Sequence, residues 1–166
     1  MQVRKSGMGT HQSTDLQNDE WLTPPRIINS LGEFDLDPCA PVYRPWDTAN
    51  KHFTLDDNGL LQPWDGRVWL NPPYGRYTSE WINKLSLHGN GIALIFARTE
   101  TSIFQDYIFP SAKAIFFIKG RLHFHHIDGR RSIHNAGAPS VLIAYGDYNA
   151  QVLKTCGLRG KYIPLH

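Results

Sequence analysis

An apolar run that ends in two consecutive prolines constrains this chain more than any other feature. Residues 68–70 have the character of a buried strand, and Asn71-Pro72-Pro73-Tyr74 follows them directly, before a glycine. Each proline ring fixes its φ at about −65° and removes a backbone donor. The residue before a proline is pushed to an extended conformation. Asn71 is therefore predicted to lie at the end of a strand, on a short and rigid loop.

The groups on this loop suit a planar amino-heterocycle such as adenine. The Asn71 side chain offers both a donor and an acceptor, the Pro72 carbonyl is a second, fixed acceptor, and Tyr74 supplies a flat ring. Asn-Pro-Pro also occurs as a plain turn, and a tyrosine beside it often packs on a core. The four residues directly after an apolar strand are more specific, and we interpret them as a base-binding loop.

Composition bounds the class of protein without deciding its partner. The 166 residues carry a net charge of +2, with a sequence pI of about 8.6, which permits nucleic-acid binding but does not require it. Cys39 and Cys156 lack the spacing of a zinc site or a disulfide framework and favour a reduced, intracellular setting. No run approaches the roughly 20 apolar residues of a membrane span, and no signal peptide is recognisable. We expect a cytoplasmic protein without a metal or a membrane segment.

The hydrophobic pattern predicts one domain over residues 20–166, preceded by a mobile polar tail over residues 1–19. Helices are predicted over residues 24–31, 78–89 and 102–109, and strands near 34–37, 68–70, 91–97, 113–118 and 140–145, with a last edge strand in the C-terminal tail. This alternation predicts an α/β fold with a mostly parallel sheet. Asp128-Gly129 adds an antiparallel hairpin on the C-terminal side.

Two segments that precede the proline loop carry polar groups suited to a ligand. Thr23 is a good N-cap and Pro24 suits the first helical position, where a hydroxyl and helix-first amides can hold a carboxylate. Asp35 and Asp37 alternate with apolar residues on a short strand that Pro38 ends. Open α/β sheets bind ligands beyond the carboxyl ends of their strands. Helix capping and turn capping are the plainer alternatives; for the acidic pair we favour ligand binding.

The order of these segments resembles that of DNA adenine-N6 methyltransferases, above all the small family found in bacteriophages and prophages. The segments are Glu20-Trp21-Leu22-Thr23-Pro24-Pro25, Phe34-Asp35-Leu36-Asp37-Pro38-Cys39-Ala40 and Asn71-Pro72-Pro73-Tyr74-Gly75. Looser matches are Asn58-Gly59-Leu60, Ala97-Arg98-Thr99 and Gly120-Arg121-Leu122-His123-Phe124. The resemblance covers roughly residues 19–146. It implies a Rossmann-like fold that uses S-adenosylmethionine, a DNA substrate and a location in the cytoplasm of a bacterial host cell.

The resemblance also implies roles for individual residues. The residues of methyl transfer are Asn71, Pro72, Pro73 and Tyr74. The cofactor-binding residues are Trp21, Thr23, Pro24, Asp35, Asp37, Pro38, Asp57 and Asn71, with Asp56 as an alternative to Asp57. The glycine-rich turn common after the first strand of methyltransferases is absent, because Asp37 is followed by Pro38-Cys39-Ala40. The target base, flipped out of the duplex, would stack on Tyr74, with its amino hydrogens on the Asn71 side-chain oxygen and the Pro72 carbonyl.

The predicted hairpin is the candidate DNA-facing element. Its basic residues are Lys119, Arg121, Arg130 and Arg131. Such a cluster contacts phosphates in a salt-sensitive way, although a solvated hairpin explains it nearly as well. His123, His125 and His126 raise a metal site as an alternative, but no third ligand stands at a recognisable spacing, and we predict no metal.

Other functions remain open from the sequence. Methyltransferases of cytosine N4, of RNA adenine or of a protein glutamine share the expected fold, and Asn71 favours adenine over cytosine. A non-catalytic DNA-binding module on a decayed methyltransferase is the alternative from a different class. The oligomeric state is open, with a monomer favoured.

Overall fold

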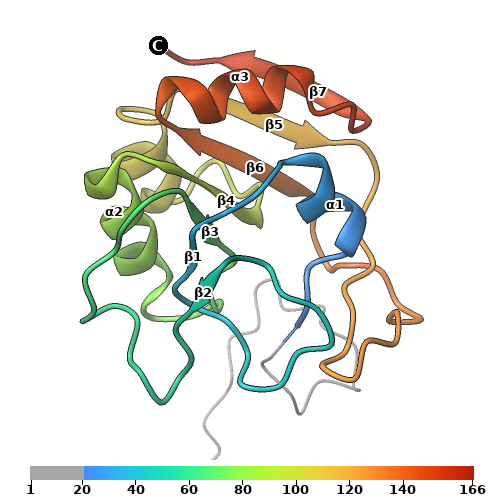
Figure 1. Cartoon of the computed structure of the whole chain (residues 1–166). Coiled ribbons are helices and arrows are strands. Elements are labelled where there is room, and N and C mark those ends of the chain that lie inside the picture. The colour runs from blue at the N-terminus through green and yellow to red at the C-terminus, as the bar shows by residue number, and fades with distance from the viewer. Residues whose placement is uncertain (1–20) are drawn as a thin grey trace, which may run out of the picture.

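The structure is a computed structural model that describes residues 21–166. The tail predicted over residues 1–19 lies outside the described residues. The described part is built on one seven-stranded sheet of order β2-β1-β3-β4-β6-β5-β7, with helices on both of its faces (Figure 1). The strands are β1 (Leu36–Asp37), β2 (Lys51–His52), β3 (Val68–Leu70), β4 (Gly91–Phe96), β5 (Ala114–Ile118), β6 (Ser140–Tyr145) and β7 (Gly160–Pro164). The helices are α1 (Pro25–Ser30), α2 (Thr78–His88), the π-helix η1 (Ile103–Ile108) and α3 (Asp147–Thr155).

The ladders divide the sheet into a parallel half and an antiparallel half. β2, β1, β3 and β4 pair in parallel, whereas β6 runs antiparallel to both β4 and β5, and β7 antiparallel to β5. The β4–β6 ladder joins six residue pairs, while the longest parallel ladder joins three. The expectation of a mostly parallel sheet is therefore wrong. The physical reason is the entry of β6 between β4 and β5, which reverses both of their ladders.

The parallel half brings the ends of four strands to one side of the sheet. We call this side the carboxyl edge, and the opposite side, where the same strands begin, the amino edge. Pro38 follows β1, Asn71 follows β3 and Ala97 follows β4 at the carboxyl edge. The first residue of β6 also lies there, because Ser140 pairs with Phe96. Loops far apart in the sequence thus meet at one edge, where the predicted site is expected.

Two apolar clusters hold the helices against the sheet. On one face, Leu70 belongs to a cluster that includes Ile82 of α2 and Phe104 of η1. On the other face, Trp69 belongs to a cluster that includes Ile27 of α1 and Leu153 of α3. Neighbouring residues of β3 therefore serve opposite faces, as the strand period requires. Burial of both faces anchors β3, and with it the loop that starts at Asn71.

Three elements differ from the sequence-based expectations. β2 lies between the strands predicted near residues 34–37 and 68–70, where no element was predicted, and the helix α3 lies in the predicted C-terminal tail, ahead of the edge strand β7. The hairpin predicted near residues 119–131 is reduced to a loop with a single bridge, His125 to Arg131. A second bridge joins His125 to Leu22. No helix among the described residues is long and apolar enough to cross a membrane.

Candidate active site

The asparagine of the proline loop, Asn71, contacts the segment that precedes α1 directly. The Asn71 side-chain nitrogen donates a hydrogen bond of 3.2 Å to the Thr23 hydroxyl oxygen. Thr23 is 2 % exposed and does not cap α1, which begins at Pro25 with Pro24 at the cap position. The predicted capping role of Thr23 is therefore wrong, because its hydroxyl faces the neighbouring loop instead. This bond commits the amide nitrogen and leaves the Asn71 Oδ1 as an acceptor.

The proline loop is held by one threonine at the start of α2. The Thr78 hydroxyl accepts a bond of 2.9 Å from the Gly75 backbone nitrogen, and its oxygen lies 2.7 Å from the Pro73 carbonyl oxygen. Gly75 has a φ of +149°, a conformation that favours glycine. No hydrogen bond within the described part of the chain occupies the Asn71 Oδ1 or the Pro72 carbonyl. The loop is thus rigid and keeps two acceptors open.

Tyr74 is partly engaged by the protein itself. Its ring stacks on Phe96 at the end of β4, with centroids 4.4 Å apart and an interplanar angle of 5°. The residue remains 41 % exposed. Burial of its hydroxyl raises the pKa of the phenol, so the side chain stays neutral in ordinary buffers. A base that stacks on Tyr74 would therefore extend an existing pair of rings.

Asp37 is a buried residue that ties loops together. It is 4 % exposed. One carboxyl oxygen accepts a bond of 2.5 Å from the Thr48 hydroxyl, and the other accepts a bond of 3.1 Å from the Cys39 backbone nitrogen. Burial raises the pKa of this carboxyl to about 6, against the lowering effect of both bonds. Because both carboxyl oxygens accept hydrogen bonds from the protein, Asp37 holds the loop segments of the carboxyl edge in place.

Asp35 lies at the other edge of the sheet. Its carboxylate accepts a bond of 2.7 Å from the Arg67 backbone nitrogen, in the segment that leads into β3. The β1 ladder begins at Leu36, paired with Val68, so Asp35 precedes the strand. The structure therefore does not bring Asp35 to Asn71, and its position lends no support to a cofactor role.

Asp57 occupies the loop that follows β2 and remains exposed. One of its oxygens, Oδ2, accepts bonds of 2.8 Å and 3.2 Å from the Thr54 backbone nitrogen and hydroxyl. The other oxygen has no partner among the described residues. The same loop packs on Pro38, because a side chain at Gly59 would lie 1.9 Å from the Pro38 carbonyl oxygen. The segments after β1 and β2 thus meet, and Asp57 offers a free carboxylate oxygen beside them.

The segment before α1 is bound to the loop over residues 122–134. Leu22 and His125 exchange two backbone hydrogen bonds of 2.8 Å and 2.9 Å. The Trp21 ring is half-buried, with its centroid 4.8 Å from that of His126. Trp21 therefore contacts this loop, and the structure gives it no direct contact with Asn71. The loop joins the candidate site through the same backbone segment that carries Thr23.

The histidines of this loop hold its backbone. Nδ1 of His123 lies 3.1 Å from the Ser132 carbonyl oxygen, and Nδ1 of His125 lies 2.9 Å from that of Gly129. Because a carbonyl only accepts, each Nδ1 carries the proton that it donates. Within the described residues, no group of three histidine, cysteine, aspartate or glutamate side chains could hold a metal ion. These contacts show that the two histidine rings stabilise the backbone of the loop.

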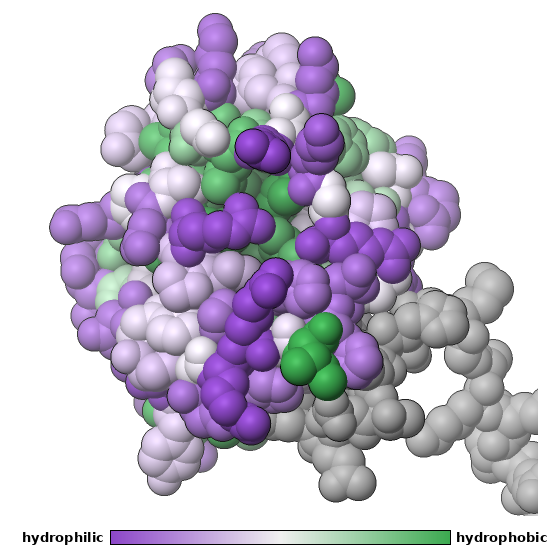
Figure 2. Space-filling model, turned by 90° about the vertical axis from the view of Figure 1, so that its right-hand side faces the viewer, coloured by the Kyte–Doolittle hydropathy of each residue, from purple (hydrophilic) through white to green (hydrophobic). Residues whose placement is uncertain are grey.

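The four basic residues predicted to contact DNA fall into two pairs. All four are exposed: Lys119, Arg121, Arg130 and Arg131. Arg121 donates a bond of 3.0 Å to the Gly137 carbonyl, and Arg130 pairs with Asp128 at 2.6 Å. Lys119 and Arg131 have no side-chain partner in the described part of the chain. Hydrophilic side chains cover much of the lower half of this side of the molecule, where the segment over residues 119–138 lies (Figure 2).

Three residues of the site were not predicted in their roles. Thr48 holds Asp37, Thr78 holds the proline loop, and Phe96 stacks on Tyr74. The sequence carries a signal for one of them, because Phe96 ends an apolar strand predicted to reach the same edge. The Thr48 bond spans 11 positions, and no local pattern records it, whereas the Thr78 bonds reach back only three and five positions.

This arrangement defines a class of protein: a mixed α/β domain with an open pair of acceptors and an aromatic ring at the carboxyl edge of its sheet. A comparison with family models places the chain more narrowly. The model described as DNA N-6-adenine-methyltransferase (Dam) matches residues 10–157, and the chain belongs to this family. The resemblance inferred from the sequence is thereby confirmed, and the observed fold is consistent with a methyltransferase. Neither the curated proteins nor the solved structures contain a significant match.

Proposed function

We propose that the protein transfers a methyl group from S-adenosylmethionine to the N6 atom of adenine in DNA, and that a phage or prophage encodes it. The observation that carries the proposal is the bond from the Asn71 amide nitrogen to Thr23. This bond leaves the Asn71 Oδ1 and the Pro72 carbonyl as two open acceptors on a rigid loop. Two acceptors match the two hydrogens of an exocyclic amino group. The family match supports the same reaction.

The residues present at the carboxyl edge fit the proposed cofactor. Asp57 offers an unused carboxylate oxygen to hydroxyl or amino groups. Asp37 keeps the Pro38 segment in place through Thr48 and Cys39. We therefore propose Asp57 as a contacting residue, with Thr23, Pro24 and Pro38 as the surrounding wall, and Asp37 as a positioning residue. S-adenosylmethionine, when bound, supplies an electrophilic methyl group on a sulfonium.

The residues of the loop activate the acceptor nitrogen by position. The lone pair of an adenine amino group is delocalised into the ring, so the nitrogen is a weak nucleophile. When the Asn71 Oδ1 and the Pro72 carbonyl hold its two hydrogens, the nitrogen approaches a tetrahedral geometry and its lone pair becomes available. Thr23 keeps the amide in this orientation, and Thr78 keeps the loop rigid. Preorganisation of this kind lowers a barrier by several kcal/mol, roughly 3 to 4 per well-placed group.

A flipped base also needs a surface to rest on. Tyr74 offers one, because its ring is already stacked on Phe96 and remains 41 % exposed. Stacking of a base on an aromatic side chain contributes about 1–3 kcal/mol. Lys119 and Arg131 are the predicted basic residues whose side chains stay open to phosphates. In this proposal, DNA lies across the carboxyl edge with the target adenine turned inward.

The product identifies the reaction. The full chain is incubated with S-adenosylmethionine labelled on its methyl group and with DNA free of N6-methyladenine, and the DNA is digested to nucleosides. We expect label in N6-methyldeoxyadenosine alone. The Asp35→Asn variant, changed at the amino edge, is the matched control and keeps the activity. Label in N4-methyldeoxycytidine, in RNA or in protein would replace the proposed substrate, and absence of transfer would refute the proposed activity.

A further inference from the structure

Arg98 is a half-buried cation that contacts the stacked rings of the candidate site. It lies two residues beyond β4, at the carboxyl edge. Its guanidinium carbon lies 5.6 Å from the centroid of the Phe96 ring, and that ring stacks on Tyr74. Burial raises the pKa of the Tyr74 phenol, and the positive charge of Arg98 opposes this rise. Arg98 is therefore one ring removed from the tyrosine on which we place the target base.

Hydrogen bonds of its backbone fix the turn that carries Arg98. The Arg98 nitrogen donates a bond of 2.9 Å to the Phe96 carbonyl. The Arg98 carbonyl accepts a bond of 3.1 Å from the Thr101 nitrogen and one of 2.7 Å from the Thr101 hydroxyl. The backbone is thus held on both sides of the residue, which reduces the entropy that its side chain loses when it binds a ligand.

The strand order separates Arg98 from the residues that we propose as cofactor contacts. Pro38 and Asp57 follow β1 and β2, whereas Arg98 follows β4. Because β3 lies between β1 and β4, the proline loop that starts at Asn71 stands between the two groups. A cation that follows β4 is therefore placed on the substrate side of the proline loop, away from Pro38 and Asp57.

A flipped nucleotide brings negative charge to the substrate side. Its base enters the protein, while its two phosphates remain joined to the rest of the strand. A guanidinium presents a planar fork of donors that matches a phosphate, and contacts of this kind position a strand on a protein. The base itself already has Asn71, Pro72 and Tyr74 as partners in the proposed function. The phosphate is therefore the group of the nucleotide that suits Arg98.

We propose that Arg98 binds, through the fork of its guanidinium, a phosphate next to the target adenine and thereby holds the flipped nucleotide against Tyr74. The inference rests on the proposed function. The task differs from that of Lys119 and Arg131, which we propose as contacts to phosphates of the duplex in general. Loss of the Arg98 charge should therefore be felt at one linkage of the target strand.

A neutral linkage at a single position tests this contact. The adenine that the unaltered protein methylates is first mapped in a short duplex, and a methylphosphonate then replaces the phosphate on one or the other side of that adenine. We expect one of the two replacements to lower kcat/KM for DNA by about 10- to 100-fold in the unaltered protein, because a charge-assisted hydrogen bond is lost. The same replacement should change kcat/KM of Arg98→Gln by less than about twofold, since this variant has no charge there to lose. The KM of Arg98→Gln for S-adenosylmethionine should not change.

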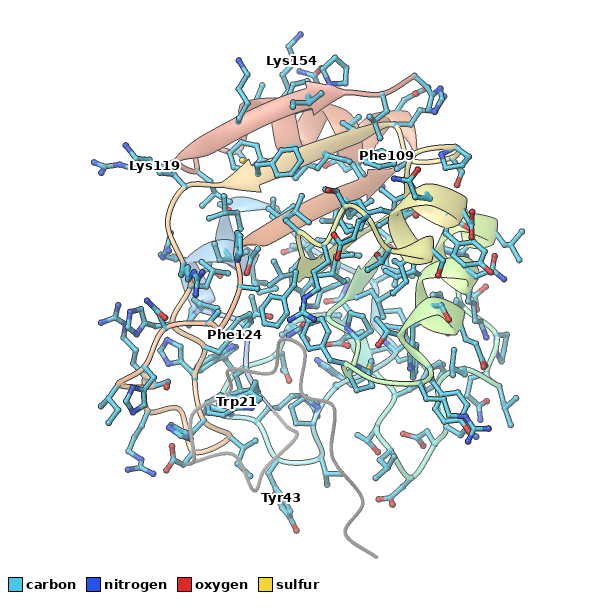
Figure 3. All side chains as sticks on the ribbon, turned by 180° about the vertical axis from the view of Figure 1, so that it is seen from behind. Trp21, Tyr43, Phe109, Lys119, Phe124 and Lys154 are labelled. Atoms are coloured by element: carbon cyan, nitrogen blue, oxygen red, sulfur yellow. The ribbon has the colours of Figure 1, made fainter. Side chains whose placement is uncertain are left out.

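Lys154→Gln is the matched control, because it removes one positive charge far from the site. Lys154 is exposed in the last turn of α3. Figure 3 shows it at the opposite end of the molecule from Trp21, which belongs to the segment that carries Thr23. This variant should respond to the neutral linkage as the unaltered protein does. Arg98→Lys should keep only part of the response, because an ammonium supplies the charge without the fork.

The outcomes separate the inference from the function on which it rests. An equal loss in the unaltered protein and in Arg98→Gln, or no loss at either linkage, overturns the phosphate contact and leaves the methyltransferase in place. If Arg98→Gln does not fold, Arg98→Lys decides, and a response equal to that of the unaltered protein overturns the contact. Absence of methylation by the unaltered protein refutes the proposed function and the phosphate contact together.

Discussion

The two edges of the sheet use the same kinds of side chain for opposite purposes. At the amino edge, Arg67 donates bonds of 2.7 Å to the Asn149 side chain and 2.9 Å to the Glu33 carbonyl, and its guanidinium lies 4.1 Å from the Phe34 ring centroid. Asn149 is fully buried and donates in turn to Asn90 and to a backbone carbonyl. Nη2 of Arg67 is buried without a hydrogen-bond partner among the described residues.

At the carboxyl edge, two side chains form hydrogen bonds within the protein through only one of their two polar atoms. Asn71 uses its nitrogen and keeps its oxygen, and Asp57 uses one oxygen and keeps the other. A polar group whose partners are all internal stabilises the fold, whereas a group that is fixed at one end and open at the other is ready for a ligand. The difference between the edges therefore separates the residues that we regard as structural from those that we propose as functional, a distinction that the sequence alone does not make.

The sharpest test of this comparison removes the open acceptor. Asn71→Ala should slow methyl transfer by at least about 100-fold, because it deletes one of two groups that position the reacting nitrogen. The free energy of unfolding should change by less than about 1 kcal/mol, since the lost bond to Thr23 is a single neutral one. Rates of labelled methyl transfer and urea unfolding measure the two effects. A variant that methylates DNA at the original rate contradicts the mechanism.

The opposite result is expected at the amino edge. Arg67→Ala should lower the free energy of unfolding by about 2–4 kcal/mol, because it leaves Asn149 and a backbone carbonyl unpaired in the interior. The rate of methyl transfer by the protein that remains folded should stay unchanged. Asp65→Ala, exposed in the same region, is the control and should change stability by less than about 0.5 kcal/mol. If Arg67→Ala slowed methyl transfer and left the unfolding curve unchanged, the assignment of a purely structural role to the amino edge would be wrong.

Asp37 gives the smallest effect and one with a definite pH dependence. Its pKa is raised to about 6 in the folded state, against about 4 in an unfolded chain. The native state therefore retains a proton that the unfolded chain has lost, and stability falls as the pH rises from about 4 to about 6 and then levels off. Relative to Asp37→Asn, the unaltered protein should lose about 2–3 kcal/mol over this range.

Urea unfolding at pH 4 and pH 7 measures that difference. Asp35→Asn serves as the control, because it removes a carboxylate two residues away on an exposed position. A pH profile shared by all three proteins would show that the Asp37 carboxyl does not titrate as a buried group.

The sequence predicted the strand and the proline loop of the candidate site better than the contacts around them. An apolar run before two prolines identifies the loop at Asn71, because both the strand and the prolines act locally. The bond to Thr23 spans 48 positions, and no local pattern encodes it. Strand alternation predicted that Asp35 and Asp37 lie on one face of a single strand, whereas Asp35 precedes β1 and is exposed and Asp37 is buried. It could not tell that β1 begins between them, so it missed that Asp35 lies at the opposite edge.

The direction of the strands was the least predictable feature. A continuous apolar run such as residues 140–145 is compatible with a parallel and with an antiparallel strand, because either strand can be buried on both faces. The order of the strands in space depends on where the long segment between β5 and β6 rejoins the sheet. The hydrophobic pattern does not contain this information. The family match supports a DNA adenine methyltransferase activity, and the open acceptors of the proline loop are the physical basis that we propose for it.

The position of β6 has a consequence for synthesis of the chain. β6 pairs with β4 and β5 on either side, yet its residues leave the ribosome after both of those strands. Until about residue 145 has emerged, β4 and β5 have no common partner, and their edges stay exposed to other nascent chains. The proline loop, although encoded in the first half of the message, therefore gains its final support only when the last third is translated.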